Sequence, residues 1–103
     1  MLRLKDIKPT EAEITKEIRA YLDIRGIPHF KKLQGLGSPK GISDIIGCLQ
    51  IGRIGRFLAI EVKKEGQELT ENQFLWQERF RQAGAICIVA HSVEDVEKEL
   101  GNA

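Results

Sequence analysis

Residues 57–64 read FLAIEVKK, an apolar run of strand length that ends in a carboxylate and two lysines. Burying such a charge without a partner is costly, so each charge predicts a partner or a function. Successive side chains of a strand point to opposite faces, which places Glu61 and Lys63 on one face and Val62 on the other. An acid and a base on one face can contact each other or a common ligand. The run therefore predicts a buried strand that ends in an ion pair or a functional site.

The segments before this strand predict one helix and two further strands. Thr10 and Glu13 have the spacing of a capping box, and Gly26 followed by Pro28 ends the helix that they open. Apolar residues recur between these signals at helical spacing. We then expect, in chain order, a strand at 28–33, a glycine-rich loop at 34–41, a strand at 42–51 and a turn at 52–56.

The segments after residue 64 predict a helix, a strand and a terminal helix. Thr70 and Gln73 have the spacing of a second capping box, and Gly84 ends the helix that begins there. Residues 85–90, AICIVA, are apolar throughout, as expected for a strand covered on both faces. Ser92 is the expected N-cap of a last helix. The order αβββαβα, with a helix between two strands, predicts an α/β fold with some parallel pairing.

Length and composition narrow the class of protein. The chain has 103 residues, of which 42% are hydrophobic and 30% charged, and this predicts one globular domain over residues 1–103. No apolar run approaches the roughly 18 residues of a membrane span, and no apolar leader opens the chain, so we expect a cytoplasmic protein without a membrane partner. Cys48 and Cys87 lie in apolar runs without nearby histidines, which argues against a zinc site.

Asp44 supplies a second carboxylate near the same place. It stands in ISDII, close to the start of the preceding strand, and a hairpin between the two strands would bring it near Glu61. Two neighbouring carboxylates repel unless a cation lies between them, and such oxygen ligands suit Mg²⁺ or Mn²⁺. Lys63 would then hold an attacking water or stabilise charge on a phosphoryl group. The alternatives are an exposed ion pair of Glu61 with Lys63 and a turn aspartate at position 44.

These residues resemble the signature of the PD-(D/E)XK nucleases, with Asp44 as the first acid and EVK at residues 61–63 as the E-X-K element. From about residue 11 to residue 93 the chain is similar to the compact, virus- and phage-type branch called VRR-NUC. The similarity rests on the order and spacing of G-x-x-D, IEVKK, the Q-x-x-W of residues 73–76 and the AGA before the last strand. Ser43 departs from the pattern, since a proline usually precedes this aspartate, but the position supplies no ligand.

The resemblance implies a restriction-endonuclease-like fold, in which helices flank a mixed sheet, and a set of site residues. Asp44 and Glu61 would be metal ligands together with the backbone carbonyl of Val62, and the metal would be Mg²⁺ or Mn²⁺. Lys63 would be the catalytic lysine. The family places a glutamine close to the active site, and here that glutamine is Gln73.

Two of the implied roles leave alternatives open. The family often adds a glutamate from the first helix, and Glu11 is the candidate because it shares a helix face with the apolar stripe. Glu11 could instead complement the helix dipole in the first turn. Gln73 could serve only as the capping-box partner of Thr70.

The lysines near the glycine-rich loop predict contacts with phosphates. Lys31, Lys32 and Lys40 flank this loop, and Lys64 follows the catalytic lysine. Their charge suits the backbone of a nucleic acid, although a solvated rim is the alternative for the three loop lysines. The loop sequence GLGSPKG lacks the GxxxxGK[ST] spacing of a phosphate-binding P-loop, which argues against an NTPase.

Together these features predict a metal-dependent DNA endonuclease that hydrolyses phosphodiester bonds in replication, recombination or repair. The resemblance implies a homodimer that prefers branched DNA, such as a four-way junction. The alternatives are a non-catalytic nucleic-acid-binding protein of the same fold and an RNA-directed nuclease. Intact Asp44, Glu61 and Lys63 argue against the first, whereas no recognisable residue pattern separates DNA from RNA.

Overall fold

The computed structural model describes residues 7–32 and 41–101, and it confirms the order αβββαβα. The helices are α1 (Glu11–Ile24), α2 (Glu71–Gln82) and α3 (Val93–Leu100). The strands are β1 (His29–Lys31), β2 (Ile45–Ile51), β3 (Ile54–Val62) and β4 (Ile86–Ala90). They form one sheet in the order β1-β2-β3-β4, in which β1, β2 and β3 pair antiparallel and β3 pairs parallel with β4. The expected mixed sheet is therefore confirmed.

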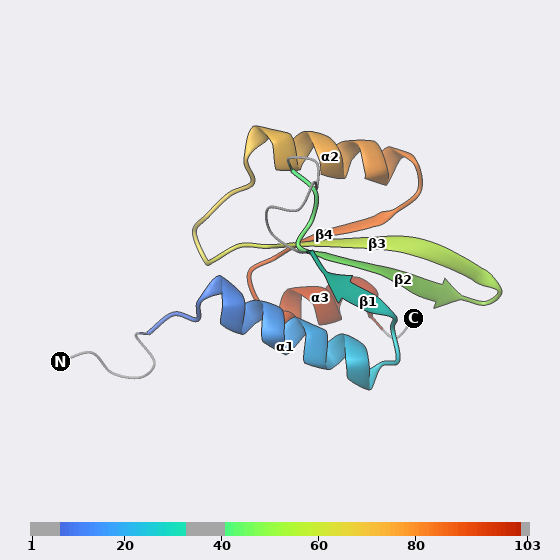
Figure 1. Cartoon of the computed structure of the whole chain (residues 1–103), viewed down its shortest axis with the longest axis horizontal. Helices are drawn as coiled ribbons and strands as arrows, with labels where there is room; N and C mark the ends of the chain where they lie inside the picture. Colours follow the sequence, from blue (N-terminus) through green and yellow to red (C-terminus); the bar gives the residue numbers. More distant parts are fainter. Residues whose placement is uncertain (1–6, 33–40, 102–103) are drawn as a thin grey trace.

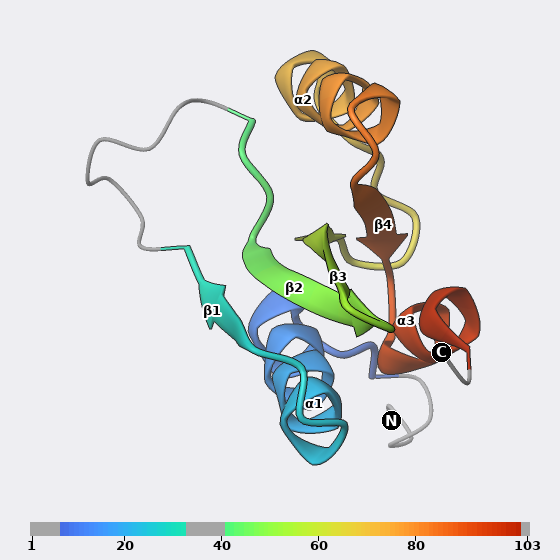
Figure 2. The same cartoon turned by 90° about the vertical axis from the view of Figure 1, so that its right-hand side faces the viewer.

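The helices lie on both faces of this sheet. Helices α1 and α3 cover one face, and α2 lies on the other (Figures 1 and 2). The parallel β3–β4 pair requires a crossover, which α2 provides. Helix α2 lies over β4, on the face opposite α3, so β4 is covered from both sides as its apolar sequence indicated.

The hydrophobic core fills the layer between the sheet and the α1–α3 pair. Residues of α1 at helical spacing, such as Ile14, Ile18 and Leu22, are buried against alternate residues of the strands. The strands contribute Ile45 and Leu49 from β2, and Leu58, Ile60 and Val62 from β3. Because side chains alternate along a strand, the residues between these positions point to the α2 face. Glu61 is one of them, so the core itself places this carboxylate opposite α1 and α3.

Both capping boxes form as the sequence predicted. The Thr10 hydroxyl accepts a hydrogen bond from the Glu13 backbone at 3.1 Å, and the Glu13 carboxylate accepts one from the Thr10 backbone at 3.3 Å. Thr70 and Gln73 make the same reciprocal pair at the start of α2. These bonds satisfy backbone donors that the first turn of a helix leaves free, which explains why both helices begin where they do.

The connection between β2 and β3 is shorter than predicted. The five-residue turn at 52–56 is wrong, because strand pairing extends to Ile51 opposite Ile54 and leaves only Gly52 and Arg53 in the turn. Gly52 has a φ of +62°, a conformation that glycine adopts without steric cost. A glycine at the first position of a two-residue turn matches the twist of a hairpin, and residues 54–56 are thereby free to pair.

Helix α2 attaches to the sheet through a stack of aromatic rings. The Phe80 ring stacks on Phe57 of β3 and on Trp76 of its own helix, each with ring centroids 5.1 Å apart. Both α2 aromatics are only half-buried and lie outside the main core, although their apolar rings would suit core positions. Gln77 is the one fully buried side chain of α2. Helix α2 therefore buries fewer of its side chains than α1, and the main core lies on the other face of the sheet.

Candidate active site

The hairpin register places Asp44 directly opposite Glu61. Ile45 pairs with Ile60 in the β2–β3 ladder, so the residue before one faces the residue after the other. The Asp44 Oδ2 atom accepts a hydrogen bond of 2.7 Å from the Val62 backbone N–H. This bond fixes the first acid at the end of β3. The two predicted acids therefore meet at the end of the hairpin where β2 begins and β3 ends.

Glu61 is buried and only half satisfied. Its side chain is 2% exposed, and Oε1 accepts a hydrogen bond of 2.8 Å from Gln73 Nε2. The other oxygen, Oε2, is buried without a hydrogen-bond partner. Burial, reinforced by the charge of Asp44, raises the pKa of Glu61 to about 8, although Lys32 and Lys63 oppose the shift. A buried carboxylate with a free oxygen beside a second acid fits a divalent cation.

Gln73 combines the two roles that the sequence left open. Its Oε1 atom accepts from the Thr70 backbone at 2.9 Å and completes the capping box, while its Nε2 atom donates to Glu61. An amide can do both because it carries an acceptor and a donor on one carbon. The start of α2 is thereby tied to the acid at the end of β3.

We expect Gln73→Glu to keep the helix cap and impair the site. A carboxylate can accept from the Thr70 backbone, but it cannot donate to Glu61 and adds a third negative charge. Loss of such a supporting contact should lower the cleavage rate about 10- to 100-fold. Thermal melting should show little change in this variant and a larger loss in Gln73→Ala, which removes both bonds. A cleavage rate equal to that of the wild type would assign Gln73 to the cap alone.

The basic residues divide into a site lysine and peripheral lysines. Lys32 Nζ lies 4.0 Å from Asp44 Oδ1 and donates to the Ile42 carbonyl at 3.1 Å, so it belongs to the acid cluster rather than to a rim. Lys31 points the other way and lines a small hollow beside α1. Lys64 is exposed beyond the end of β3, and Lys40 lies outside the described residues.

The sequence did not indicate how close Lys32 lies to the acids. The pairing of β1 with β2 explains this proximity. Lys31 pairs with Ile45, so the next pair along the two strands is Lys32 with Asp44. The Lys32 backbone N–H indeed donates to the Asp44 carbonyl at 2.8 Å. Lys32, Asp44 and Glu61 thus form one row across three strands. Strand alternation alone could not reveal this row, because it fixes faces and not partners.

Val62 ends β3, and Lys63 extends the site one residue beyond it. The Lys63 backbone N–H donates to the Ala90 carbonyl at 3.0 Å, which continues the β3–β4 pairing by one residue. The Lys63 side chain is half-buried, and its charge lowers the pKa of Glu61, although burial and Asp44 outweigh it. Val62 packs its side chain in the core while its backbone N–H bonds to Asp44.

Glu11 does not join the two acids in this structure. Within residues 7–32 and 41–101, no three His, Cys, Asp or Glu side chains gather as a metal-binding group. Glu11 lies in the first turn of α1 and is half-buried. The end of β3 is nevertheless close to this part of the chain, since Lys8 Nζ lies 3.9 Å from Glu65 Oε2. The metal-binding role of Glu11 stays a prediction.

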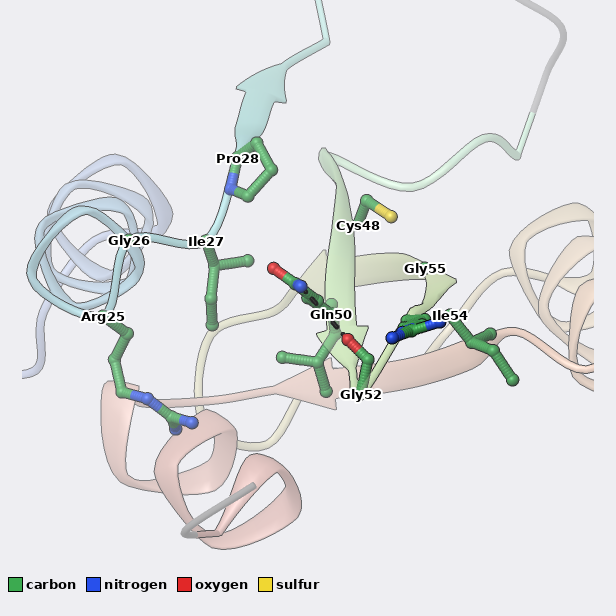
Figure 3. Close-up of a pocket in the computed structure, with 11 residues that line it drawn as sticks. Arg25, Gly26, Ile27, Pro28, Cys48, Gln50, Gly52, Ile54 and Gly55 are labelled. Atoms are coloured by element: carbon green, nitrogen blue, oxygen red, sulfur yellow. Dashed lines mark hydrogen bonds between the residues drawn. The ribbon is translucent and has the colours of Figure 1, made fainter.

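The acids do not line the surface hollow at the tip of the β2–β3 hairpin. That hollow, of about 600 Å³, lies between the loop after α1 and the tip of the β2–β3 hairpin (Figure 3). Its lining includes Arg25, Gln50 and Arg53, and none of the predicted site residues. Arg25 is already bonded to the Tyr21 hydroxyl and to the Gly101 carbonyl. The candidate site is therefore identified by the paired carboxylates Asp44 and Glu61.

Gly41 brings the segment before Asp44 against α2. A Cβ atom at this position would lie 2.6 Å from the Asn72 backbone and 2.8 Å from Trp76 Cδ1, and the φ of +87° also favours glycine. Any other residue would push this segment away from the helix. The Gly41 of the G-x-x-D pattern thus sets the distance between α2 and the strand that follows Asp44.

Comparison with known proteins agrees with the observed fold. The VRR-NUC domain matches residues 8–94 of this sequence. The chain belongs to the VRR-NUC family. A solved structure described as a VRR_NUC domain is similar with a TM-score of 0.73 and 26% identity, covering 89% of this chain and 95% of that one. A second, a VRR_NUC domain protein, has a TM-score of 0.70 and 20% identity, covering 91% of this chain and 87% of that one, and at this identity it supports the fold alone.

Membership of the VRR-NUC family defines the general class of this protein. Curated protein sequences give no match. The VRR-NUC domain is a nuclease-family domain, so the chain has a nuclease fold and nucleic acid is its class of partner. In the described part of the chain, no helix is long and apolar enough to cross a membrane.

Proposed function

We propose that this VRR-NUC protein is a DNA endonuclease that depends on Mg²⁺ or Mn²⁺. The observation that carries the proposal is the buried, unpartnered Oε2 of Glu61 opposite Asp44. A structural carboxylate would find a donor for such an oxygen, because leaving it unsatisfied in the interior destabilises the fold. A cation between Asp44 and Glu61 would satisfy the oxygen and remove the repulsion between the acids.

The ligands of this cation come from adjacent strands. Asp44 Oδ1 and Glu61 Oε2 are the available oxygens, since Asp44 Oδ2 is bonded to the Val62 N–H and Glu61 Oε1 to Gln73. The N–H and the carbonyl of one strand residue point to the same side, so the Val62 carbonyl would be the third ligand from this chain. Bound there, the ion would lower the pKa of a water molecule and neutralise phosphate charge.

The lysines supply the positive charge that the acids lack. Lys63, on the same face as Glu61, positions the attacking water or stabilises charge on the phosphate in the transition state. Lys32 holds Asp44 when the cation is absent, and the two compete for the Asp44 Oδ1 oxygen. Lys64 and Lys31 contact the nucleic acid backbone outside the site, where contacts add affinity without reading sequence.

Asp44→Asn tests the metal directly. The amide keeps the shape and can still accept from the Val62 N–H, so the fold should persist, while one ligand charge is lost. Calorimetry should show Mn²⁺ binding to the wild type and weaker or no binding to the variant, with cleavage reduced by orders of magnitude. Wild-type cleavage should stop in EDTA. Full activity in EDTA would overturn the metal mechanism, and unchanged Mn²⁺ binding would remove Asp44 from the site.

We further propose that the substrate is branched DNA, such as a four-way junction, and that the protein acts as a homodimer. One active site cuts one strand, and symmetric resolution of a junction needs two sites related by a two-fold axis. Light scattering across micromolar concentrations should give the mass of a dimer, and a junction should outcompete linear duplex. Labelled RNA serves as a third competitor. A monomer that cuts linear DNA equally well would remove the junction assignment and leave the nuclease standing.

A further inference from the structure

His91 contacts the backbone of the proposed catalytic lysine. It follows β4 directly and precedes Ser92, the N-cap of α3. Its ring Nδ1 lies 3.2 Å from the Lys63 carbonyl oxygen and 3.1 Å from that of Lys64. Carbonyl oxygens only accept hydrogen bonds, so Nδ1 carries the proton and donates to both. One ring thereby binds two successive carbonyls just past the end of β3.

This contact fixes a part of the chain that the sheet leaves free. The β3 strand ends at Val62, and the Lys63 N–H bond to the Ala90 carbonyl is the last link to β4. Among the described residues, no strand pairs with the carbonyls of Lys63 and Lys64, which are the atoms that His91 binds. The Lys64 carbonyl also accepts from the Gln67 N–H at 3.0 Å, so His91 is the side chain that holds the Lys63 carbonyl. The Lys63 backbone is therefore held on its N–H side by β4 and on its carbonyl side by the ring.

His91 is itself held by α3. Its backbone N–H donates to Asp95 Oδ2 at 2.8 Å, and the Asp95 N–H donates to the Ser92 hydroxyl at 3.4 Å. Helix α3 is anchored in the core by Val96 and Leu100. The core thus holds α3, the first turn of α3 holds His91, and the His91 ring holds the backbone of Lys63.

We propose that His91 is a positioning residue for Lys63. Within the part of the chain that the structure describes, its hydrogen bonds go to Asp95 and to the carbonyls of Lys63 and Lys64, and none goes to Asp44 or Glu61. It holds the backbone of residues 63 and 64 so that the Lys63 ammonium stays on the face of Asp44 and Glu61. A misplacement of about 1 Å in a reacting group can cost about 100-fold in rate, which is the scale at which such a restraint matters. The inference rests on the proposed function, in which Lys63 acts in cleavage.

Two substitutions at His91 distinguish the hydrogen bonds of the ring from its packing volume. Asparagine places an amide N–H where Nδ1 lies, whereas leucine has a similar size and no donor. We expect His91→Leu to lower kcat about 10- to 100-fold while KM and Mn²⁺ binding stay within threefold of the wild type. His91→Asn should recover most of the rate. If the leucine variant does not fold, His91→Ala with the same asparagine comparison replaces it.

A double substitution tests whether the effect passes through Lys63. In a Lys63→Ala background, His91→Leu should lower the single-turnover rate no further, because the group that it positions is gone. Additive losses would overturn the inference, as would an asparagine variant as slow as the leucine variant. A leucine variant with wild-type kcat, or one that loses Mn²⁺ binding in parallel with rate, would also overturn it. A wild type that cleaves no nucleic acid would instead refute the proposed function, so the two failures are distinguishable.

Discussion

Glu61→Gln is expected to abolish cleavage and, without metal, to make the fold more stable at alkaline pH. The glutamine keeps the shape of the side chain and can accept from Gln73, but it removes the charge that a cation requires. Metal-free wild-type protein must bury that charge once pH rises past its pKa. The Glu61 carboxylate is therefore expected to be required for cleavage and to destabilise the metal-free fold at alkaline pH.

The direction of the pH effect follows from the pKa of Glu61, which burial and Asp44 raise from 4.5 in a free side chain to about 8. Between these values the folded protein holds the proton and the unfolded chain releases it. The stability of the metal-free protein should accordingly fall as pH rises through this window, by up to about 1.4 kcal/mol per pH unit. Glu61→Gln should flatten that dependence.

Chemical denaturation in EDTA across this pH range measures the effect. Glu68→Gln, which removes a charge from the exposed loop after β3, is the matched control and should keep the wild-type slope. Added Mn²⁺ should raise the melting temperature of the wild type and of the control, because a ligand that binds only the folded state stabilises it. It should leave Glu61→Gln unchanged. A wild-type stability that is flat over the window would show that Glu61 is not buried as described.

Lys63→Ala is expected to remove turnover and to spare binding. Loss of one group that stabilises transition-state charge costs about 100- to 1,000-fold in rate. Affinity for DNA should change little, because Lys64 and other exposed basic residues still contact phosphates. Lys64→Ala is the matched control from the adjacent, exposed position. It should weaken binding and reduce the slope of log K against log salt by about 1, with turnover at saturation unchanged.

Single-turnover rates with saturating enzyme, together with binding isotherms at several salt concentrations, distinguish the two lysines. The measurement should show a rate defect in one variant and an affinity defect in the other. If Lys63→Ala loses binding and cleavage equally, Lys63 is a phosphate anchor and not part of the chemistry. An affinity that does not depend on salt would argue against the peripheral lysines as contacts.

The element order and the helix starts could be predicted from the sequence because they depend on local chemistry. Thr10 and Thr70 bond to residues three positions away, and helical spacing of apolar residues identifies the buried stripe of α1. The E-X-K element and the aspartate before β2 were recognisable for the same reason, as short patterns of residue type and spacing. The prediction failed at residues 54–56. The positive φ of Gly52 allows a two-residue turn, so these residues pair in β3 and do not belong to the turn.

The sequence by itself determined the αβββαβα order and the face of β3 that carries Glu61 and Lys63. It also indicated the VRR-NUC family, through Asp44 and the E-X-K element. Only the tertiary structure decided which residues from different strands meet. Register placed Lys32 and Asp44 in one row with Glu61, the close approach at Gly41 set the position of α2, and the turn after β4 put His91 on the Lys63 carbonyl. The reason is physical: alternation along a strand fixes a face within two residues, whereas partners across strands depend on pairing and packing of distant segments.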